Sequence, residues 1–308
     1  MKRFFLVLFF CVSGLYAQEY ERIDAMIPMY PSQFDAAEAF SNMLSRDFTT
    51  DEDKVRAMYT WLIHNVAYDP SEYKVFNYSF KNYRERNQKE AKTREKIIQR
   101  TLQTGKAVCE GYAFVIEKLC NLQGIENFLI RGDTKTHFED IGRPFRKSHM
   151  WNAIKLNGQW HLFDATWGAG KYQGKFIKDP TYFYFMCDPK QLVKSHYPEM
   201  EEDTFLTEPT SFATFQQWPL IISPQILPKD VLSPEGGTVF SNSSMNEVYF
   251  EIQTASPKEI HYSYGKEKES VVFSVKEGVL NFSVPVQIGP SSLVIYFDEH
   301  PVLGYKVK

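Results

Sequence analysis

The sequence has 308 residues, of which 43% are hydrophobic and 24% are charged, proportions that are typical of a folded globular protein and exclude a disordered chain. Its formal net charge is −3, and it carries no basic stripe with interleaved aromatic residues, so we expect no nucleic-acid partner. A chain of this length favours two domains and allows a large buried core.

Residues 1–17 have the features of a secretory signal peptide. They begin with Lys2 and Arg3, continue with an apolar run over residues 4–12, and end in small-residue cleavage spacing at Ala17. That run is too short to span a membrane, and no second long apolar run follows. We therefore expect a secreted protein, or a periplasmic one if the source is bacterial, with no integral membrane segment after cleavage. The expected partner is a protein or peptide substrate, and the oligomeric state stays open.

Three cysteines remain after this cleavage: Cys109, Cys120 and Cys187. An odd number of cysteines in an oxidising compartment indicates at least one free or reactive thiol. Cys120 and Cys187 allow either a disulfide bond or two buried thiols.

Two amphipathic helices are predicted near the start of the mature chain. Residues 33–45 place apolar side chains on one face, and a second helix runs from the capping residues Thr49–Asp51 to Val66. Both patterns predict scaffold helices that face the core.

The next stretch is rich in aromatic and then in charged residues. Residues 72–83 alternate as in a short strand, and the charged run 84–96 leads into a helix that Gly105 ends. A solvated helix face is the favoured interpretation of the charged run, and a lid over a site is the second.

Residues 104–124 predict the helix around which the rest of the chain is best understood. Apolar residues recur at three- and four-residue spacing after Cys109, and Gly124 supplies a stop signal. Cys109 therefore lies at or just before the first turn, where unpaired backbone N–H groups and the helix dipole stabilise an anion. A thiolate is such an anion and is the nucleophilic form of cysteine. The alternative is a buried structural cysteine.

A β-hairpin is predicted around Asn157-Gly158, the strongest short hairpin signal, with strand-like runs on both sides. In a two-residue turn, Trp151 lies across from Asp164. His149 lies across from Thr166 in the same register.

This register brings His149 and Asp164 together. They are diagonal neighbours on one face, about 7–8 Å apart at Cα and within side-chain reach. His161 points to the opposite face by the same two-residue period. For His149 alone, a half-buried structural histidine is the alternative.

The rest of the chain completes one domain and adds another. Residues 182–186 predict an aromatic strand, and a short helix follows Asp188-Pro189, which completes a domain over 18–218. A proline-rich linker is predicted over 219–235, and a small antiparallel β-sandwich over 236–308. The strand-like runs of the sandwich are 246–253, 258–264, 271–275, 279–285, 292–298 and 302–307.

Cys109, His149 and Asp164 supply the three roles of nucleophilic acyl transfer. A thiolate attacks an acyl carbon, a histidine activates the thiol and later protonates the leaving amine, and a carboxylate orients the imidazole and stabilises its positive form. The intermediate is a thioester, which water or another amine resolves.

The segments around these residues resemble known motifs. AVCEGYAF contains Cys109, SHMWNAIKL contains His149, WHLFDATWG contains Asp164, and KVRAMYTWLIHNVAYD precedes all three. Over about residues 50 to 200, the chain resembles the transglutaminase-like superfamily, in its branch of cytokinesis proteins and kyphoscoliosis peptidases. The resemblance implies a papain-like α+β core, with helices packed on an antiparallel sheet, and the same three residues as the catalytic triad.

One departure bears on the reaction. Val108 and Glu110 flank the cysteine, where animal cross-linking transglutaminases typically have Gln-Cys-Trp. This weakens the expectation of protein cross-linking.

The surroundings of the triad are less defined. The Cys109 backbone N–H and the Trp61 side chain are candidate oxyanion donors. Trp61, Trp151 and Trp167 are expected to line the substrate cleft. Without an EF-hand loop, CxxC or HExxH motif, we expect no metal and no cofactor.

The favoured hypothesis is a cysteine-dependent acyl-transfer enzyme that hydrolyses peptide or isopeptide bonds. A transglutaminase that joins a glutamine acyl group to an amine is the first alternative. A non-catalytic binding or assembly module on the same fold is the second.

Overall fold

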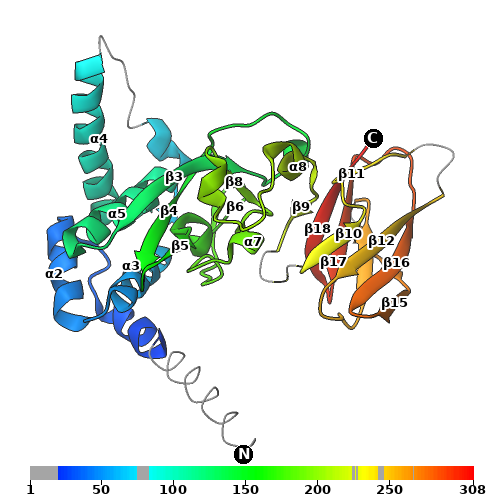
Figure 1. Ribbon diagram of the computed structural model, residues 1–308, viewed down its shortest axis with the longest axis horizontal. Helices are drawn as coiled ribbons and strands as arrows, with labels where there is room; N and C mark the ends of the chain where they lie inside the picture. The colour runs from blue at the N-terminus through cyan, green and yellow to red at the C-terminus, as the bar shows by residue number, and fades with distance from the viewer. Residues whose placement is uncertain (1–19, 75–82, 224–225, 227, 242–245, 266) are drawn as a thin grey trace, which may run out of the picture. The chain divides into compact units, whose positions relative to one another are not determined.

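The computed structural model describes residues 20–74, 83–223, 226, 228–241, 246–265 and 267–308 (Figure 1). The chain divides into two compact units. The first consists of the residues up to Ile130 and His149–Cys187, and the second consists of Arg131–Ser148 and Asp188–Lys308. The predicted signal peptide lies outside the described residues.

Four helices of the first unit, α2 (Ala37–Asp47), α3 (Asp51–Asn65), α4 (Tyr83–Thr104) and α5 (Cys109–Gln123), lie where helices are predicted. The unit also contains η1 (Ile27–Met29), η2 (Pro70–Lys74) and α6 (Ala165–Ala169), which the sequence pattern did not predict. Thr50 begins α3 because its hydroxyl accepts a hydrogen bond from the Asp53 backbone N–H. Gly124 ends α5 with a positive φ of 71°. The first predicted helix begins at Ala37 instead of residue 33, since Ala36 is still extended.

The aromatic stretch before α4 is only partly described. Of the strand predicted over 72–83, residues 75–82 lie outside the described residues, and residues 72–74 belong to the 3-10 helix η2 instead. The helix predicted to end at Gly105 is α4.

The hairpin has the predicted register. The strands of this unit are β1 (Ala67–Tyr68), β2 (Lys106–Ala107), β3 (Asn127–Thr134, which continues into the second unit), β4 (His149–Leu156), β5 (Gln159–Phe163), β6 (Gly170–Tyr172) and β7 (Phe176–Lys178). Strands β4 and β5 pair antiparallel with Leu156 opposite Gln159, and β3 follows β4 in the same sheet. Asn157 and Gly158 have φ values of 51° and 78°, as a mirror-image two-residue turn requires.

The prediction for the end of this hairpin is wrong. Strand β5 stops at Phe163, and α6 begins at Ala165, so Thr166 does not lie opposite His149 in a strand. The cause is Asp164, whose side chain accepts the backbone N–H groups of Thr166 and Trp167 and thereby starts a helix.

The strand predicted over residues 182–186 is also wrong, because this segment forms turns. The aromatic side chains of this segment pack in the core although the segment is not a strand. The Phe185 ring, for example, packs edge-on against the Phe163 ring, with the ring centroids 5.2 Å apart. Only Cys187, just beyond the segment, makes a single strand-like bridge, to Leu162.

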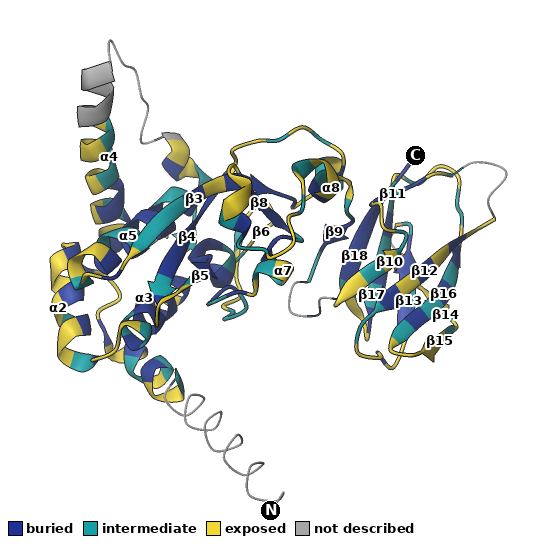
Figure 2. Ribbon diagram, in the orientation of Figure 1, coloured by how far each residue is buried: buried dark blue, intermediate teal, exposed yellow. Residues whose placement is uncertain are grey.

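Helix α5 lies at the buried centre of the first unit (Figure 2). It packs on β4, where the Asn152 side-chain amide donates a hydrogen bond of 3.0 Å to the Ala113 carbonyl. This bond fixes the helix that begins with Cys109 against the strand that begins with His149.

The second unit contains the predicted sandwich. Its helices and strands are η3 (Phe138–Asp140), α7 (Pro189–Leu192), β8 (His196–Pro198), η4 (Glu201–Thr204), α8 (Phe212–Gln217), β9 (Leu220–Ile221), β10 (Asp230–Ser233), β11 (Thr238–Val239), β12 (Glu247–Gln253), β13 (Ile260–Ser263), β14 (Glu269–Val271), β15 (Phe273–Lys276), β16 (Val279–Pro285), β17 (Ser292–Phe297) and β18 (His300–Val307). One sheet has the order β10-β12-β16-β15, and the other has β11-β18-β17-β13-β14 with β9 beside β18. Phe250 and Leu280 of the first sheet share a core with Ile295 and Tyr305 of the second.

Two details of the sandwich differ from the sequence pattern. The predicted linker over 219–235 contains β9 and β10, which pair with β18 and β12. The predicted strand 271–275 is two strands, because the chain crosses from one sheet to the other at Val272, which is 93% exposed. The helix predicted after Asp188-Pro189 is α7, and the Asp188 side chain caps it.

No disulfide bond joins Cys120 and Cys187 in the described part of the chain, and both side chains are buried. Burial raises the pKa of Cys120 well above its usual value, which makes this thiol unreactive. Among the described helices, none combines the length and apolar character that crossing a membrane requires.

Candidate active site

Cys109 is the first residue of α5, as predicted. Val108 before it is extended, and the helix continues for 15 residues. The Cys109 side chain is therefore close to the backbone N–H groups of the first turn, which have no partner inside the helix. It is 4% exposed, so its environment is shielded from bulk water.

His149 and Asp164 form a buried pair at the open end of the hairpin, where β4 begins and β5 ends. The His149 Nε2 lies 2.6 Å from Asp164 Oδ2. The other carboxylate oxygen of Asp164 accepts the N–H groups of Thr166 and Trp167, at 2.8 and 3.0 Å. Asp164 is thus held by the helix that it caps, and its orientation fixes the orientation of the imidazole.

Cys109 also interacts with His149, and this interaction is among the causes that raise the pKa of the imidazole. Burial lowers the pKa of His149, but the Asp164 carboxylate and the hydrogen bonds to Asp164 and Cys109 together raise it to about 10. This environment favours an imidazolium, which is the partner that a thiolate needs.

Two tryptophans border the imidazole. The Trp151 ring stacks near the His149 ring at 5.9 Å, and the Trp167 ring lies 6.2 Å away at an angle. Trp151 is buried and Trp167 is half-buried, so Trp167 is the one of the two that reaches the surface.

Trp61 does not lie at this site. It is completely buried in α3, and its indole N–H donates to the Pro31 carbonyl at 2.8 Å. Its ring packs on Phe34 and Phe40. The prediction that Trp61 lines a cleft or stabilises an oxyanion is therefore wrong: its position on the apolar face of α3 makes it a core residue.

Tyr73 is the neighbour of the cysteine that sequence reasoning missed. Its hydroxyl oxygen lies 4.0 Å from Cys109 Sγ and 3.4 Å from the Tyr68 hydroxyl oxygen. Sequence reasoning assigned residues 72–83 to a strand, whereas Tyr73 belongs to the 3-10 helix η2. The direction of its side chain depends on this local turn, and strand-like alternation of aromatic residues does not predict it.

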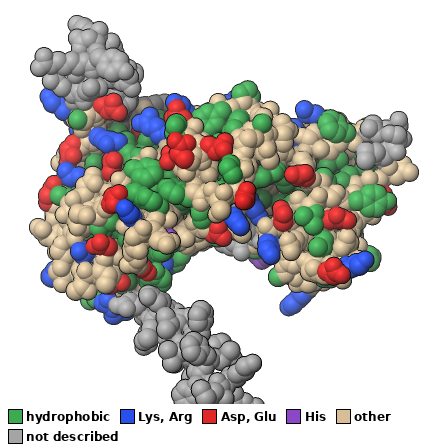
Figure 3. Space-filling model, viewed as in Figure 1, with side chains coloured by type: hydrophobic (Ala, Val, Ile, Leu, Met, Phe, Trp, Pro, Cys, Tyr) green, Lys and Arg blue, Asp and Glu red, His purple; other side chains and the backbone are tan. Residues whose placement is uncertain are grey.

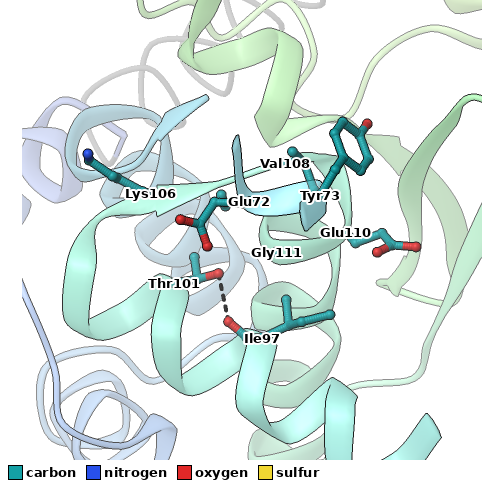
Figure 4. Close-up of a pocket in the computed structure, with 9 residues that line it drawn as sticks. Glu72, Tyr73, Ile97, Thr101, Lys106, Val108, Glu110 and Gly111 are labelled. Carbon is teal, nitrogen blue, oxygen red and sulfur yellow. Dashed lines mark hydrogen bonds between the residues drawn. The ribbon is translucent and has the colours of Figure 1, made fainter. Parts of the chain in front are cut away.

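A pocket of about 210 Å³ begins beside the cysteine (Figure 4). Tyr73, Val108 and Glu110 lie at one end, and Ile97 and Thr101 of α4 lie at the other. The pocket thus adjoins Val108 and Glu110, the chain neighbours of Cys109, and is large enough for part of a substrate.

Charges are mixed on the face of the molecule in Figure 3. Lys and Arg side chains are interspersed with Asp and Glu there and do not gather into one basic patch. The prediction that nucleic acid is not a partner stays a prediction.

One group in the second unit has the composition of a metal site. Glu259, His261 and Glu299 offer ligand atoms within 4.8 Å of one another. Lys268 Nζ lies 2.6 Å from Glu299, so an ammonium group already neutralises one of these ligands.

The helices and the antiparallel sheet form a transglutaminase-like fold, with Cys109 at the start of helix α5 and His149 at the start of strand β4. Residues 38–165, a segment that includes Cys109, His149 and Asp164, match the sequence model of the Transglutaminase-like superfamily. The chain is thus similar to this superfamily over that segment.

Individual proteins are also similar to this chain. The chain is 25% identical to the kyphoscoliosis peptidase of Homo sapiens over 288 residues, which cover 91% of this chain and 40% of that protein. It is 24% identical to the kyphoscoliosis peptidase of Mus musculus over 283 residues, which cover 90% and 40%. A crystal structure of a TGase is 17% identical and covers 55% of this chain and 37% of that one, with a TM-score of 0.28. The chain spans about two fifths of the length of its human and mouse relatives.

Proposed function

We propose that the protein is a cysteine-dependent acyl-transfer enzyme that hydrolyses peptide or isopeptide bonds, with Cys109, His149 and Asp164 as its catalytic residues. The observation that carries the proposal is the position of His149, whose Nε2 lies 2.6 Å from Asp164 Oδ2 and whose pKa is raised by interactions with both Asp164 and Cys109. A histidine held between a carboxylate and a thiol is the arrangement that activates a cysteine nucleophile.

In the proposed reaction, the Cys109 sulfur attacks the carbonyl carbon of the substrate. The imidazolium of His149 then gives its proton to the departing amine, and a thioester remains on the cysteine. His149, now neutral, takes a proton from water as the water attacks the thioester. The carboxylic acid product leaves, and the Cys109 thiolate and the His149 imidazolium are restored. Asp164 holds the imidazole in one orientation throughout and stabilises its positive form.

Water is the proposed acceptor because of the residues around the nucleophile. Val108 and Glu110 replace the Gln and Trp that are typical of animal cross-linking transglutaminases. The transglutaminase alternative predicts incorporation of a dansylated alkylamine into a glutamine peptide. The binding-module alternative predicts no turnover, with partner binding that depends on the sandwich over residues 236–308.

The test is cleavage of a complex peptide mixture by the wild-type protein and by Cys109→Ala. We expect new peptide amino termini, or freed lysine ε-amines for isopeptides, only with the wild-type protein, read by mass spectrometry after amine labelling. Equal patterns from both proteins would contradict the proposed hydrolysis. Labelling by the dansylated amine without new termini would favour transamidation instead.

We also propose that residues 1–17 are removed on secretion and that the sandwich supports or targets the catalytic part. Mass spectrometry of the mature amino terminus tests the first point, with Gln18 as the expected first residue.

A further inference from the structure

Tyr73 belongs to η2 and reaches the nucleophile from the side of the pocket. Its side chain is 51% exposed, whereas Cys109 is 4% exposed. Tyr73 also lines the pocket of about 210 Å³, together with Val108 and Glu110 on either side of Cys109 in the chain (Figure 4).

The Tyr73 hydroxyl stays protonated over the working range of pH. Burial first, and then the neighbouring Cys109 charge and the hydrogen bond with Tyr68, raise the pKa of Tyr73 far above its usual value. A neutral phenol is a good hydrogen-bond donor. When Tyr68 donates its own proton to the Tyr73 oxygen, the Tyr73 proton is left for a third group.

We propose that the Tyr73 hydroxyl donates a hydrogen bond to the oxyanion that forms when Cys109 attacks a substrate carbonyl. The inference rests on the proposed function and assigns the oxyanion donor of the same site. The 4.0 Å between the Tyr73 oxygen and Cys109 Sγ fits this role. In a tetrahedral adduct the oxyanion lies about 2.7 Å from the sulfur, so an oxyanion on the side of Tyr73 can come within the about 2.7–3.1 Å of its hydroxyl that such a hydrogen bond needs.

The sulfur lone pair forms the C–S bond while the π electrons of the carbonyl move to oxygen, and the new negative charge accepts the Tyr73 O–H without proton transfer. When the adduct collapses, the C=O bond forms again, the C–N bond breaks, and the amine leaves with the His149 proton. Tyr73 ends the step as it began, as a neutral phenol.

A second donor is available on the other side of the oxyanion. The Cys109 backbone N–H is the first of α5 and has no acceptor within its own helix. A side-chain hydroxyl and a backbone N–H together form an oxyanion hole of two donors. Tyr68, whose hydroxyl oxygen lies 3.4 Å from the Tyr73 hydroxyl oxygen, is a positioning residue for the first donor.

The experiment compares two reactions of the same thiol in the full chain. Acylation by p-nitrophenyl acetate passes through an oxyanion, whereas alkylation by iodoacetamide displaces iodide and forms none. We expect Tyr73→Phe to slow the p-nitrophenolate burst by about 100-fold and to leave the alkylation rate of Cys109 within about twofold. Tyr172→Phe is the matched control, because its ring packs 5.8 Å from Tyr68. It should change neither rate by more than about twofold.

Each other outcome overturns the assignment. An unchanged burst in Tyr73→Phe would show that the hydroxyl is not the donor, and a faster burst would show that it restrains the thiol. A parallel loss of both reactions would assign Tyr73 to the state of the sulfur and not to the oxyanion. If wild-type Cys109 neither acylates nor alkylates, the proposed function itself fails and the role of Tyr73 fails with it. Normal wild-type acylation with an unchanged variant overturns Tyr73 alone.

Discussion

Asp164→Asn removes the charge beside His149 and keeps almost everything else. Asparagine has the same shape and is an equally good helix cap, so its side-chain oxygen can still accept the N–H groups of Thr166 and Trp167. The variant therefore isolates the electrostatic contribution of the carboxylate to His149 from its structural contribution to α6.

The expected size follows from the pKa of His149, which the folded protein raises from 6.5 to about 10. At pH 8 a group with a pKa of about 10 is about 99% protonated, whereas one with the ordinary value of about 6.5 is about 3% protonated. Without the carboxylate, burial lowers the pKa of His149 further. The imidazolium population at pH 8 should therefore fall at least about 30-fold in Asp164→Asn.

The assay is an NMR titration of the His149 ring between pH 5 and pH 11, with His149→Gln to assign the signal. We expect its midpoint below about 6.5 in Asp164→Asn and well above that value in the wild-type protein. The matched control is Asp164→Ala, which loses the cap as well and should be about 1 kcal/mol less stable than Asp164→Asn. A His149 midpoint that stays high in Asp164→Asn would refute the idea that the carboxylate holds the imidazolium.

Three further predictions concern stability and are measured by urea unfolding. The raised pKa of His149 means that the folded state keeps a proton that the unfolded state has lost between about pH 6.5 and pH 10. The contribution of this group is thus complete below that window and is lost as pH rises through it, so wild-type stability should fall with pH relative to Asp164→Asn; parallel curves would contradict this. Gly168→Ala should cost about 1–3 kcal/mol, because a Cβ there would overlap the Tyr59 hydroxyl, and a cost near zero would mean that this contact yields easily. Thr50→Ala should cost about 1 kcal/mol through the lost cap of α3, while Thr50→Ser should restore most of it.

The sequence was sufficient for the parts of the site that depend on local periodicity. The Cys109 helix follows from three- and four-residue spacing and a glycine stop. The hairpin register follows from Asn157-Gly158, since both residues accept the positive φ that a two-residue turn needs. This register alone places His149 and Asp164 within reach of each other, before any tertiary contact is known.

The parts that sequence reasoning missed depend on competition between local interactions and tertiary packing. Asp164 could continue a strand by pattern, but its carboxylate satisfies two backbone N–H groups and begins α6 instead. Trp61 and Tyr73 are both upstream aromatic residues. Tertiary packing alone places Trp61 in the core and brings the Tyr73 hydroxyl to Cys109.

The double use of Asp164 gives the fold and the chemistry different tolerances at one position. The fold needs any side chain that can cap a helix, so Asn, Ser or Thr would keep α6 in place. The chemistry needs a negative charge beside the imidazole, which of these residues only Asp provides. Under the proposed function, one substitution here would remove catalysis from a descendant of this protein while the cap of α6 is kept. The residue at this position then separates an enzyme from a binding protein that has the same shape.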